Sequence, residues 1–311
     1  MSAFSASDGE SNRTLLVTGA SGHLGRRVVE LLLGEGLRDR VVAMSRSVDR
    51  LGGLEALGAE TRSGDFDDPS SLDRAFRGVD RLLIVSTDAV GQPGRRGEQH
   101  KVAIAAAARA GVRHVVYTSL TNPTPDSPLS IARDHLVSES ALAAAAFGFT
   151  ALRNNLYAEF LVEALVEAAG SGSGSSSGSG EYVTARGDGA IAYVSREDCA
   201  RAAAAALASS FDGRRTMEVS GPEALTGNDL ATLTSELTGR PVRHVSLSSD
   251  AWTQRLVEAG VPRANAELYV AYELAAARGL LGTVSDTVLQ LTGTPPSSVR
   301  ELLRARLSFP S

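Results

Sequence analysis

Three glycines spaced three residues apart form the clearest chemical motif of this 311-residue sequence. They lie in the segment Gly19-Ala20-Ser21-Gly22-His23-Leu24-Gly25, between an apolar strand pattern and an amphipathic helix pattern. Such glycines permit a sharp turn, a close approach of backbone to phosphate, and tight packing of the helix on the strand. The helix N-terminus can then hold a diphosphate. A ligand-free strand-to-helix turn is the alternative. We assign to dinucleotide binding Gly19, Ser21, Gly22, His23, Leu24 and Gly25.

The next predicted strand, 41–44, ends in Ser45-Arg46-Ser47 and has no carboxylate at its end. A carboxylate at this place binds the ribose 2′-hydroxyl and selects NAD, whereas a cation accommodates the 2′-phosphate of NADP. The guanidinium of Arg46 can bind a phosphate through two parallel hydrogen bonds. An ordinary surface arginine is the alternative interpretation. The sequence therefore predicts NADPH as the cofactor.

Two further strand ends complete the predicted cofactor site. The carboxylate of Asp65, after the third strand, can accept a hydrogen bond from the adenine amino group. Its alternative role is in a turn or helix cap, which Asp67 or Asp68 can also fill. Ser86 and Thr87 end the fourth strand, where small side chains leave room for the cofactor ribose. The residues assigned here are Asp65, Phe66, Ser86 and Thr87.

Candidates for proton transfer follow the fifth strand. His135 and Glu139 are four residues apart and share one face of a predicted helix. The imidazole can donate a proton to a substrate while Glu139 orients the ring, but a helix-stabilising surface pair is an equally good interpretation. Ser119 and Tyr117 end the strand itself, where substrate and nicotinamide are expected to meet. Ser119 can bind a substrate oxygen, whereas Tyr117 is either a catalytic residue or a core aromatic.

The kind of molecule that accepts the hydride is predicted from the absence of one residue pair. Many carbonyl reductases use a Tyr-x-x-x-Lys pair as proton donor, but Lys101 is the only lysine here and residue 97 is glycine. Hydride transfer to a quinone or conjugated dye places charge on an extended π system that solvent can protonate later. The sequence therefore favours electron-poor acceptors. Asn154 and Tyr157, after the sixth strand, are predicted to bind the substrate; a helix cap is the alternative for Asn154.

These side chains need a scaffold, and the pattern between residues 14 and 152 supplies one. Continuous apolar strands alternate with amphipathic helices, which is typical of a parallel sheet covered on both faces. The predicted strands are 15–18, 41–44, 60–62, 82–85, 114–117 and 149–152, and the predicted helices are 22–34, 49–57, 70–77, 97–110 and 130–146. We expect a doubly wound α/β sheet, the Rossmann fold, over residues 14–154.

The remaining chain is less regular. Residues 155–311 are predicted to form a smaller α+β lobe that covers the substrate, with strands near 181–184, 191–194 and 216–219. Helices are expected from residues 157, 196, 226, 249 and 263 onward. The Gly/Ser tract 170–180, natural or engineered, is predicted to be a flexible loop, and residues 1–13 a disordered tail.

Composition excludes several classes of protein. The net charge of −5 gives no reason to expect nucleic acid as a partner. No segment approaches the roughly 20 apolar residues of a membrane span, and no signal peptide is recognisable. Cys199 is the only cysteine, so an intrachain disulfide is impossible and a reducing cytoplasm is expected. The histidines lack metal-ligand spacing. We expect a monomer or homodimer that acts on a small molecule without a metal.

The motifs resemble the short-chain dehydrogenase/reductase superfamily in its atypical, NmrA-like branch. Within this branch they are most similar to bacterial type-2 NADPH:quinone oxidoreductases and triphenylmethane reductases. The matching pieces are Val17–Gly25, Gly64–Phe66, Leu82–Ser86, Gly111–Ser119, the pair His135 and Glu139, Leu152–Tyr157 and Gly187–Gly189. The resemblance implies an NADP-binding domain and a small C-terminal lobe, with a cleft for a planar or carbonyl-bearing substrate. The tract 170–180 falls where these relatives carry a loop beside that cleft.

Two classes of function remain open at this level. The first is an NADPH-dependent reductase of quinone-like or other conjugated acceptors. The second is an NADP(H)-sensing regulator without turnover, because the NmrA-like branch includes such proteins. A reductase that tailors one biosynthetic intermediate is a third possibility.

Overall fold

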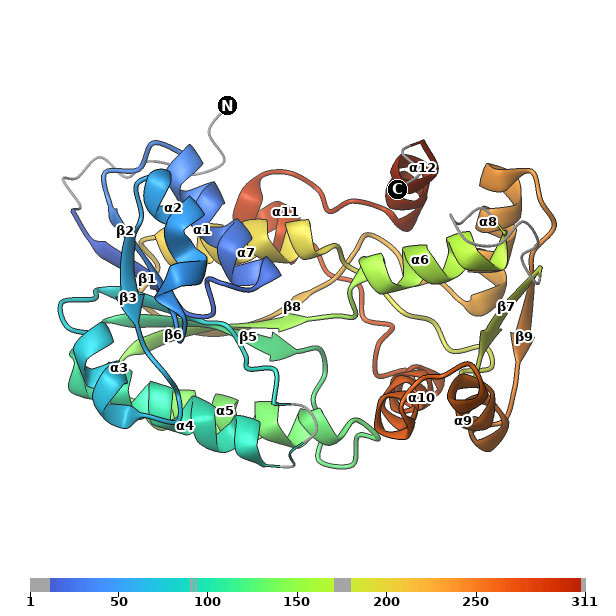
Figure 1. Cartoon of the computed structure of the whole chain (residues 1–311), viewed down its shortest axis with the longest axis horizontal. Helices are drawn as coiled ribbons and strands as arrows, with labels where there is room; N and C mark the ends of the chain where they lie inside the picture. The colour runs from blue at the N-terminus through green and yellow to red at the C-terminus, as the bar shows by residue number, and fades with distance from the viewer. Residues whose placement is uncertain (1–11, 90–91, 93, 171–179, 309–311) are drawn as a thin grey trace.

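A computed structural model describes residues 12–89, 92, 94–170 and 180–308 of the chain. Its main sheet has seven parallel strands in the order β3-β2-β1-β4-β5-β6-β8 (Figure 1). The strands are β1 (Thr14–Val17), β2 (Arg40–Ser45), β3 (Glu60–Ser63), β4 (Arg81–Ile84), β5 (His114–Leu120), β6 (Gly148–Asn154) and β8 (Arg214–Val219). The strand order reverses between β1 and β4, where the sheet is wound in both directions. The predicted doubly wound α/β fold is therefore confirmed.

Helices cover both faces of this sheet (Figure 1). One layer holds α1 (His23–Gly34), α2 (Gly52–Ala56), α7 (Arg196–Ala208) and α11 (Thr287–Thr292); the other holds α3 (Pro69–Ala75), α4 (Arg95–Arg109) and α5 (Ser130–Ala144). Successive strand residues serve the two layers in turn, because Leu15 and Val17 pack into one core and Leu16 into the other. The sequences of these strands are therefore continuous runs of apolar residues.

Helix bounds differ from the predicted ones mainly at the caps. The predicted helix 49–57 divides into a 3₁₀ turn, η1 (Val48–Leu51), followed by α2. Helix α3 starts at Pro69, after Asp68 accepts a hydrogen bond from the Ser70 amide at 3.0 Å. Asp68 thus takes the capping role that was considered for Asp65.

The seventh strand comes from the segment that was expected to form the C-terminal lobe. Strand β8 pairs in parallel with β6, and the alanine-rich helix α7 packs against α1. The chain thus leaves the sheet after Asn154 and later returns to it, so a division at residue 154 does not separate sheet from lobe. Local pattern cannot reveal this return, because β8 alternates between exposed and half-buried residues over Arg214–Met217, as an edge strand does.

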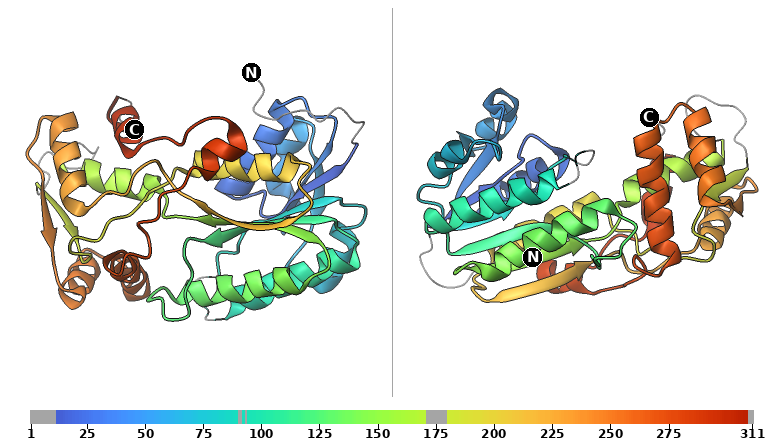
Figure 2. Two further views of the ribbon diagram at one scale, coloured as in Figure 1. Left: turned by 180° about the vertical axis from the view of Figure 1, so that it is seen from behind. Right: turned by 90° about the horizontal axis from the view of Figure 1, so that it is seen from below.

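The smaller lobe lies at one end of the molecule (Figure 2). It contains α6 (Ala158–Ala168), β7 (Glu181–Thr184), α8 (Gly227–Thr238), β9 (Arg243–Ser246), α9 (Ser249–Glu258), α10 (Arg263–Ala277) and α12 (Val299–Ser308). Strands β7 and β9 form a second, two-stranded parallel sheet. The segment predicted as strand 191–194 makes only isolated bridges, Ile191 with Leu225 and Val194 with Tyr157. The predicted tail up to residue 11 and most of the Gly/Ser tract, 171–179, lie outside the described residues.

Arg81, the first residue of β4, joins the returning segment to the amino edge of the sheet. Its side chain is buried and donates to the carbonyl oxygens of Leu207 at 2.7 Å and Ala206 at 3.1 Å, in the last turn of α7. It also donates to the Phe211 carbonyl at 3.1 Å. Burial lowers the pKa of Arg81 to about 10. Carbonyls at a helix C-terminus have no partner within the helix, so Arg81 both satisfies them and complements the helix dipole.

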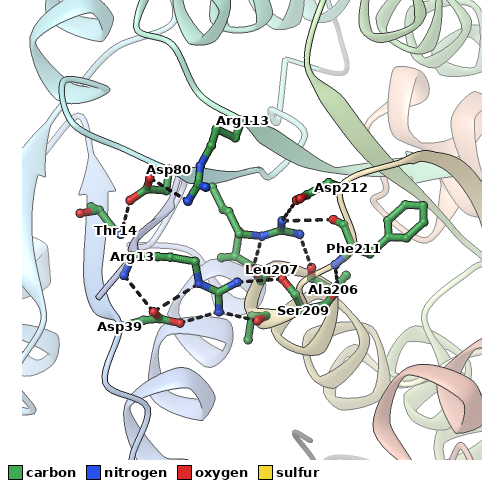
Figure 3. A network of polar contacts seen from close by, with 12 residues as sticks. Arg13, Thr14, Asp39, Asp80, Arg113, Ala206, Leu207, Ser209, Phe211 and Asp212 are labelled. Atoms are coloured by element: carbon green, nitrogen blue, oxygen red, sulfur yellow. Dashed lines mark hydrogen bonds and ion pairs between the residues drawn. The ribbon is translucent and has the colours of Figure 1, made fainter. Parts of the chain in front are cut away.

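A second arginine caps the same helix end. Arg13 donates to the carbonyl oxygens of Ala208 at 2.7 Å and Ser209 at 2.9 Å. Asp39, which precedes β2, balances its charge through an ion pair at 2.7 Å (Figure 3). The end of α7 is therefore fixed to both β1 and β4.

Substitution Arg81→Met is expected to lower the free energy of unfolding by about 2–4 kcal/mol, because buried carbonyls lose their donors. Denaturant unfolding followed by circular dichroism measures this. The control is Arg113→Met, which removes an arginine side chain that is 62% exposed and paired with Asp80 at 3.0 Å. The control should change stability by no more than about 0.5 kcal/mol. Equal losses in the two variants would contradict the capping role of Arg81.

Candidate active site

The glycine loop has the geometry that its spacing predicts. Gly19 has a φ of +62°, in the left-handed region that favours glycine, and its carbonyl accepts the Gly22 amide at 2.9 Å. A Cβ on Gly25 would lie 2.5 Å from the Gly19 oxygen, so only glycine allows α1 to pack this closely. Gly22 is exposed and is the N-cap of α1, without a side-chain hydrogen bond to the first turn. The first amides of α1 are thus available to a ligand.

A cleft opens beside this loop, at the carboxyl ends of β1 to β4. The predicted cofactor residues that line it are Gly19, Ser21, Gly22, Arg46, Asp65, Phe66, Ser86 and Thr87. Residues that sequence reasoning missed are Thr18, Met44, Ser45, Gly64, Val85, Asp88 and Gln99. The missed strand residues adjoin predicted ones, whereas Gln99 comes from α4 and no local pattern indicates it.

Three predicted residues of the loop do not line the cleft. His23 is exposed at the start of α1, Leu24 packs against the core beneath the helix, and Gly25 is buried. Gly25 acts by permitting close packing. For His23 and Leu24 a contact with the cofactor through the backbone remains a prediction.

Arg46 has the free side chain that the cofactor assignment needs. It is exposed, and no hydrogen bond or ion pair holds it within the part of the chain that the structure describes. The strand end is tied to the loop, because the Ser45 hydroxyl donates to the Ser21 hydroxyl at 2.9 Å. Asp65 keeps part of its alternative role, since its carboxylate accepts the Asp67 amide at 3.0 Å. Asp65 nevertheless lines the cleft.

A buried polar cluster lies between β5, α4 and α5. The Tyr117 hydroxyl is 2.8 Å from Nδ1 of His135 and 3.1 Å from Nδ1 of His100. All three side chains are buried. Burial, reinforced by the charge of Arg96, holds the pKa of His135 well below its ordinary value. Burial therefore favours the neutral form of the His135 ring.

His100 links this cluster to the cleft. Its Nε2 accepts a hydrogen bond from the Thr87 amide at 3.1 Å, so the neutral ring carries its proton on Nδ1. Nδ1 lies 2.8 Å from the Ser138 hydroxyl, which itself donates to the Asp134 carbonyl at 2.7 Å. Burial and the charge of Arg96 lower the pKa of His100 to about 3. Sequence reasoning missed His100, whose position on an alanine-rich helix gives no functional signal.

The expected pairing of Glu139 with His135 is not formed. The carboxylate of Glu139 accepts two hydrogen bonds from Arg153 of β6, at 2.9 and 2.7 Å. It also accepts the Ser119 hydroxyl proton at 2.7 Å. The i,i+4 spacing places both residues on the sheet side of α5, but His135 contacts Tyr117 and Glu139 contacts Arg153. Glu139 and Ser119 are thus part of a polar network between β5, β6 and α5.

The predicted substrate residues adjoin each other at the start of α6. Asn154 is buried at the end of β6, and its Oδ1 has no hydrogen-bond partner among the described residues. Tyr157 lies beneath the Arg196 guanidinium, 5.4 Å from the ring centre. Burial raises the pKa of the Tyr157 phenol, and the neighbouring Asn154 side chain opposes this shift to a smaller extent. Neither residue lines the cofactor cleft.

Within residues 12–89, 92, 94–170 and 180–308, no group of three or more histidine, cysteine or acidic side chains is arranged to hold a metal ion. Over the same ranges, no helix is both long and apolar enough to span a membrane.

A parallel sheet whose order reverses beside a glycine loop defines the class of Rossmann-type dinucleotide-binding proteins. The loop, the free end of α1 and the strand-end residues all lie at that reversal. Within this class, the chain belongs to the NmrA-like family, whose model matches residues 11–290.

Individual relatives match almost the whole chain. Quinone oxidoreductase 2 of Escherichia coli is 32% identical over 92% of this chain and 96% of its own. An NAD(P)H azoreductase of Xenophilus azovorans is 30% identical over 94% of this chain and 97% of its own. The crystal structure of the Escherichia coli quinone oxidoreductase with NADPH superposes with a TM-score of 0.84, at 32% identity, covering 93% of this chain and 98% of that one. The crystal structure of triphenylmethane reductase of Citrobacter sp. with NADP(H) superposes with a TM-score of 0.84, at 31% identity, covering 93% of this chain and 99% of that one.

The buried histidines predict sensitivity to acid. The pKa of His114 on β5, like that of His100, is lowered to about 3, mainly by burial. The folded state therefore keeps these rings neutral, while the unfolded chain binds protons below about pH 6.5. Stability is complete above that pH and is lost as the pH falls towards 3, by about 1.4 kcal/mol per pH unit for each histidine. In urea unfolding at pH 7 and 5.5, His114→Gln should show a smaller pH dependence than wild type; an unchanged dependence would contradict the assignment.

Proposed function

We propose that this protein is an NADPH-dependent reductase that transfers a hydride to a quinone-like or other conjugated, electron-poor small molecule. The observation that carries the proposal is the cleft beside the glycine loop, with the free Arg46 at the end of β2. Relatives of at least 30% identity that act on quinones and azo compounds support the choice of reaction. The triphenylmethane reductase structure supports it for conjugated dyes.

The residues of the cleft fit NADPH. The uncapped N-terminus of α1 suits the pyrophosphate, and Arg46 suits the 2′-phosphate. In this proposal Asp65 and Phe66 adjoin the adenine, and Ser86 and Thr87 adjoin the ribose of the nicotinamide half. When bound, NADPH supplies the hydride. The protein's part is to hold the two reactants in contact and to exclude competing water.

The side chains predicted to be catalytic support an acceptor that needs no tuned acid. His135 is neutral and buried, Tyr117 is buried with its phenol pKa raised by that burial, and the sequence offers no Tyr-x-x-x-Lys pair. We propose that Tyr117 and His135 form the rigid wall of the site. Ser119 and Glu139 are proposed to act as positioning residues behind it. The substrate role of Asn154 and Tyr157, the cytoplasmic location and the monomeric or homodimeric state remain predictions.

The reaction is tested by the absorbance of NADPH at 340 nm. We expect steady oxidation in the presence of at least one class among benzoquinones, naphthoquinones, azo dyes and triphenylmethane dyes, because each can take up a hydride into a conjugated system. A protein that binds NADPH but turns over none of these acceptors would instead be the dinucleotide sensor that the sequence left open.

The role of Arg46 is tested by Arg46→Asp. Loss of a charge-assisted contact and addition of a carboxylate should weaken NADPH binding by about 10- to 100-fold and leave NADH binding equal or stronger. Fluorescence titration of both cofactors measures the two Kd values. Arg38→Asp, the same change at an exposed position before the opposite end of β2, is the control and should alter neither. Equal weakening of NADPH and NADH binding by Arg46→Asp would contradict the assignment of Arg46 to the 2′-phosphate.

A further inference from the structure

Arg96, in the first turn of α4, is a buried cation without a counterion. Its residue surface is only 5% exposed, and no carboxylate of the described residues lies within ion-pair distance, 4.0 Å, of its guanidinium. One contact is made, from Nη2 to Nε2 of His135 at 3.3 Å. Its Nε is buried and has no acceptor among the same residues. Burial of an unpaired charge costs several kcal/mol, so such a group is retained for a purpose other than stability.

The neighbouring acidic side chains do not neutralise this charge. Glu139 is bound to Arg153 in a two-hydrogen-bond ion pair. Asp134 of α5 acts on the same tyrosine, Tyr117, as Arg96 does, yet it forms no ion pair with Arg96. The rings of His135 and His100 are neutral, and the charge of Arg96 contributes to lowering the pKa of both. The guanidinium of Arg96 is therefore a buried positive charge that no ion pair among the described residues neutralises.

Arg96 lies between the cofactor cleft and the smaller lobe. Gln99, one turn further along α4, lines the cleft, and His100 accepts the amide of the cleft residue Thr87. On the other side, burial raises the pKa of Tyr272 on α10, and the charge of Arg96 is close enough to oppose that shift. The unpaired Nε of Arg96 thus lies on the helix that contributes Gln99 to the cleft, and the Arg96 charge reaches Tyr272 of the smaller lobe.

We propose that Arg96 binds the oxygen atom of the acceptor that becomes negatively charged during hydride transfer. This inference rests on the proposed function and narrows it to neutral, oxygen-bearing acceptors such as quinones. One carbonyl oxygen of the quinone accepts the hydride that the reduced nicotinamide supplies, the ring π electrons shift, and the negative charge resides on the opposite carbonyl oxygen. Arg96 donates hydrogen bonds to this oxyanion and keeps its own protons. A proton from solvent then completes the hydroquinone.

The sign of the charge separates two kinds of acceptor. A neutral quinone becomes an anion when it receives a hydride, so a fixed positive charge stabilises the transition state more than the ground state. A cationic triphenylmethane dye becomes neutral, so the same charge opposes its binding and gives no help in the transition state. Removal of Arg96 should therefore lower kcat/KM with the neutral quinone and leave kcat/KM with the cationic dye unchanged or higher.

The test compares Arg96→Met with Arg109→Met, which removes the same charge from the exposed far end of α4. With 1,4-benzoquinone, Arg96→Met should lose about 100-fold in kcat/KM. With the cationic dye crystal violet, kcat/KM should be equal to wild type or higher. Arg96→Lys, which keeps the charge but not the planar fork, should fall between wild type and Arg96→Met with the quinone. The control should match wild type with both acceptors.

Two measurements are independent of turnover. Arg96→Met should bind the anion 4-nitrophenolate, in the presence of NADP⁺, at least tenfold more weakly than wild type. Its resistance to denaturant should equal or exceed that of wild type, because an unpaired buried charge is removed. The role of Arg96 would be overturned if Arg96→Met bound 4-nitrophenolate as tightly as wild type. It would also be overturned if Arg96→Met lost kcat/KM equally with the quinone and the dye and was less stable than wild type. If wild type reduces neither acceptor, the proposed function fails, while the 4-nitrophenolate titration still decides whether Arg96 binds an anionic oxygen.

Discussion

The close packing of α1 against its own entry turn is the constraint on which the site depends. Because residue 25 has no Cβ, the helix approaches to where a methyl group would be 2.5 Å from the Gly19 oxygen. This contact fixes the N-terminus of α1 at the carboxyl edge of the parallel sheet, where all strand ends converge. Arg46, Asp65 and Thr87 then reach one cleft although they follow three different strands. The position of the cofactor site is thus set by backbone geometry, and side-chain chemistry then determines its specificity.

The features that sequence analysis predicted are those set by local pattern. The glycine loop, the apolar strands and the basic end of β2 each follow from a few adjacent residues, and the structure places them as expected. Local pattern failed where partners are distant in sequence. Strand β8 joins the sheet through β6, more than fifty residues earlier, and Arg153 rather than His135 takes the carboxylate of Glu139. Helical spacing predicts the direction in which a side chain points, but not which neighbouring groups compete to bind it.

The unpredicted part of the site is electrostatic. His100 and Arg96 lie on a helix rich in alanine, and their importance follows only from burial and from the groups around them. Burial favours the neutral forms of His100, His135 and Tyr117, which supports the proposal that this polar cluster forms a wall of the site. The guanidinium of Arg96 lies beside this cluster without an ion pair among the described residues. This arrangement supports the proposal of an acceptor that develops negative charge, because reduction of a simple ketone depends more on a proton donor.

A crystal structure of the ternary complex with NADP⁺ and a hydroquinone tests this account most directly. It should show the pyrophosphate on the first amides of α1, the 2′-phosphate within hydrogen-bond distance of Arg46, and a hydroquinone oxygen on the guanidinium of Arg96 facing C4 of the nicotinamide. A dinucleotide bound elsewhere than beside the glycine loop would contradict the cofactor site. A hydroquinone whose oxygens both lie beyond hydrogen-bond distance of Arg96 would contradict the proposed chemistry.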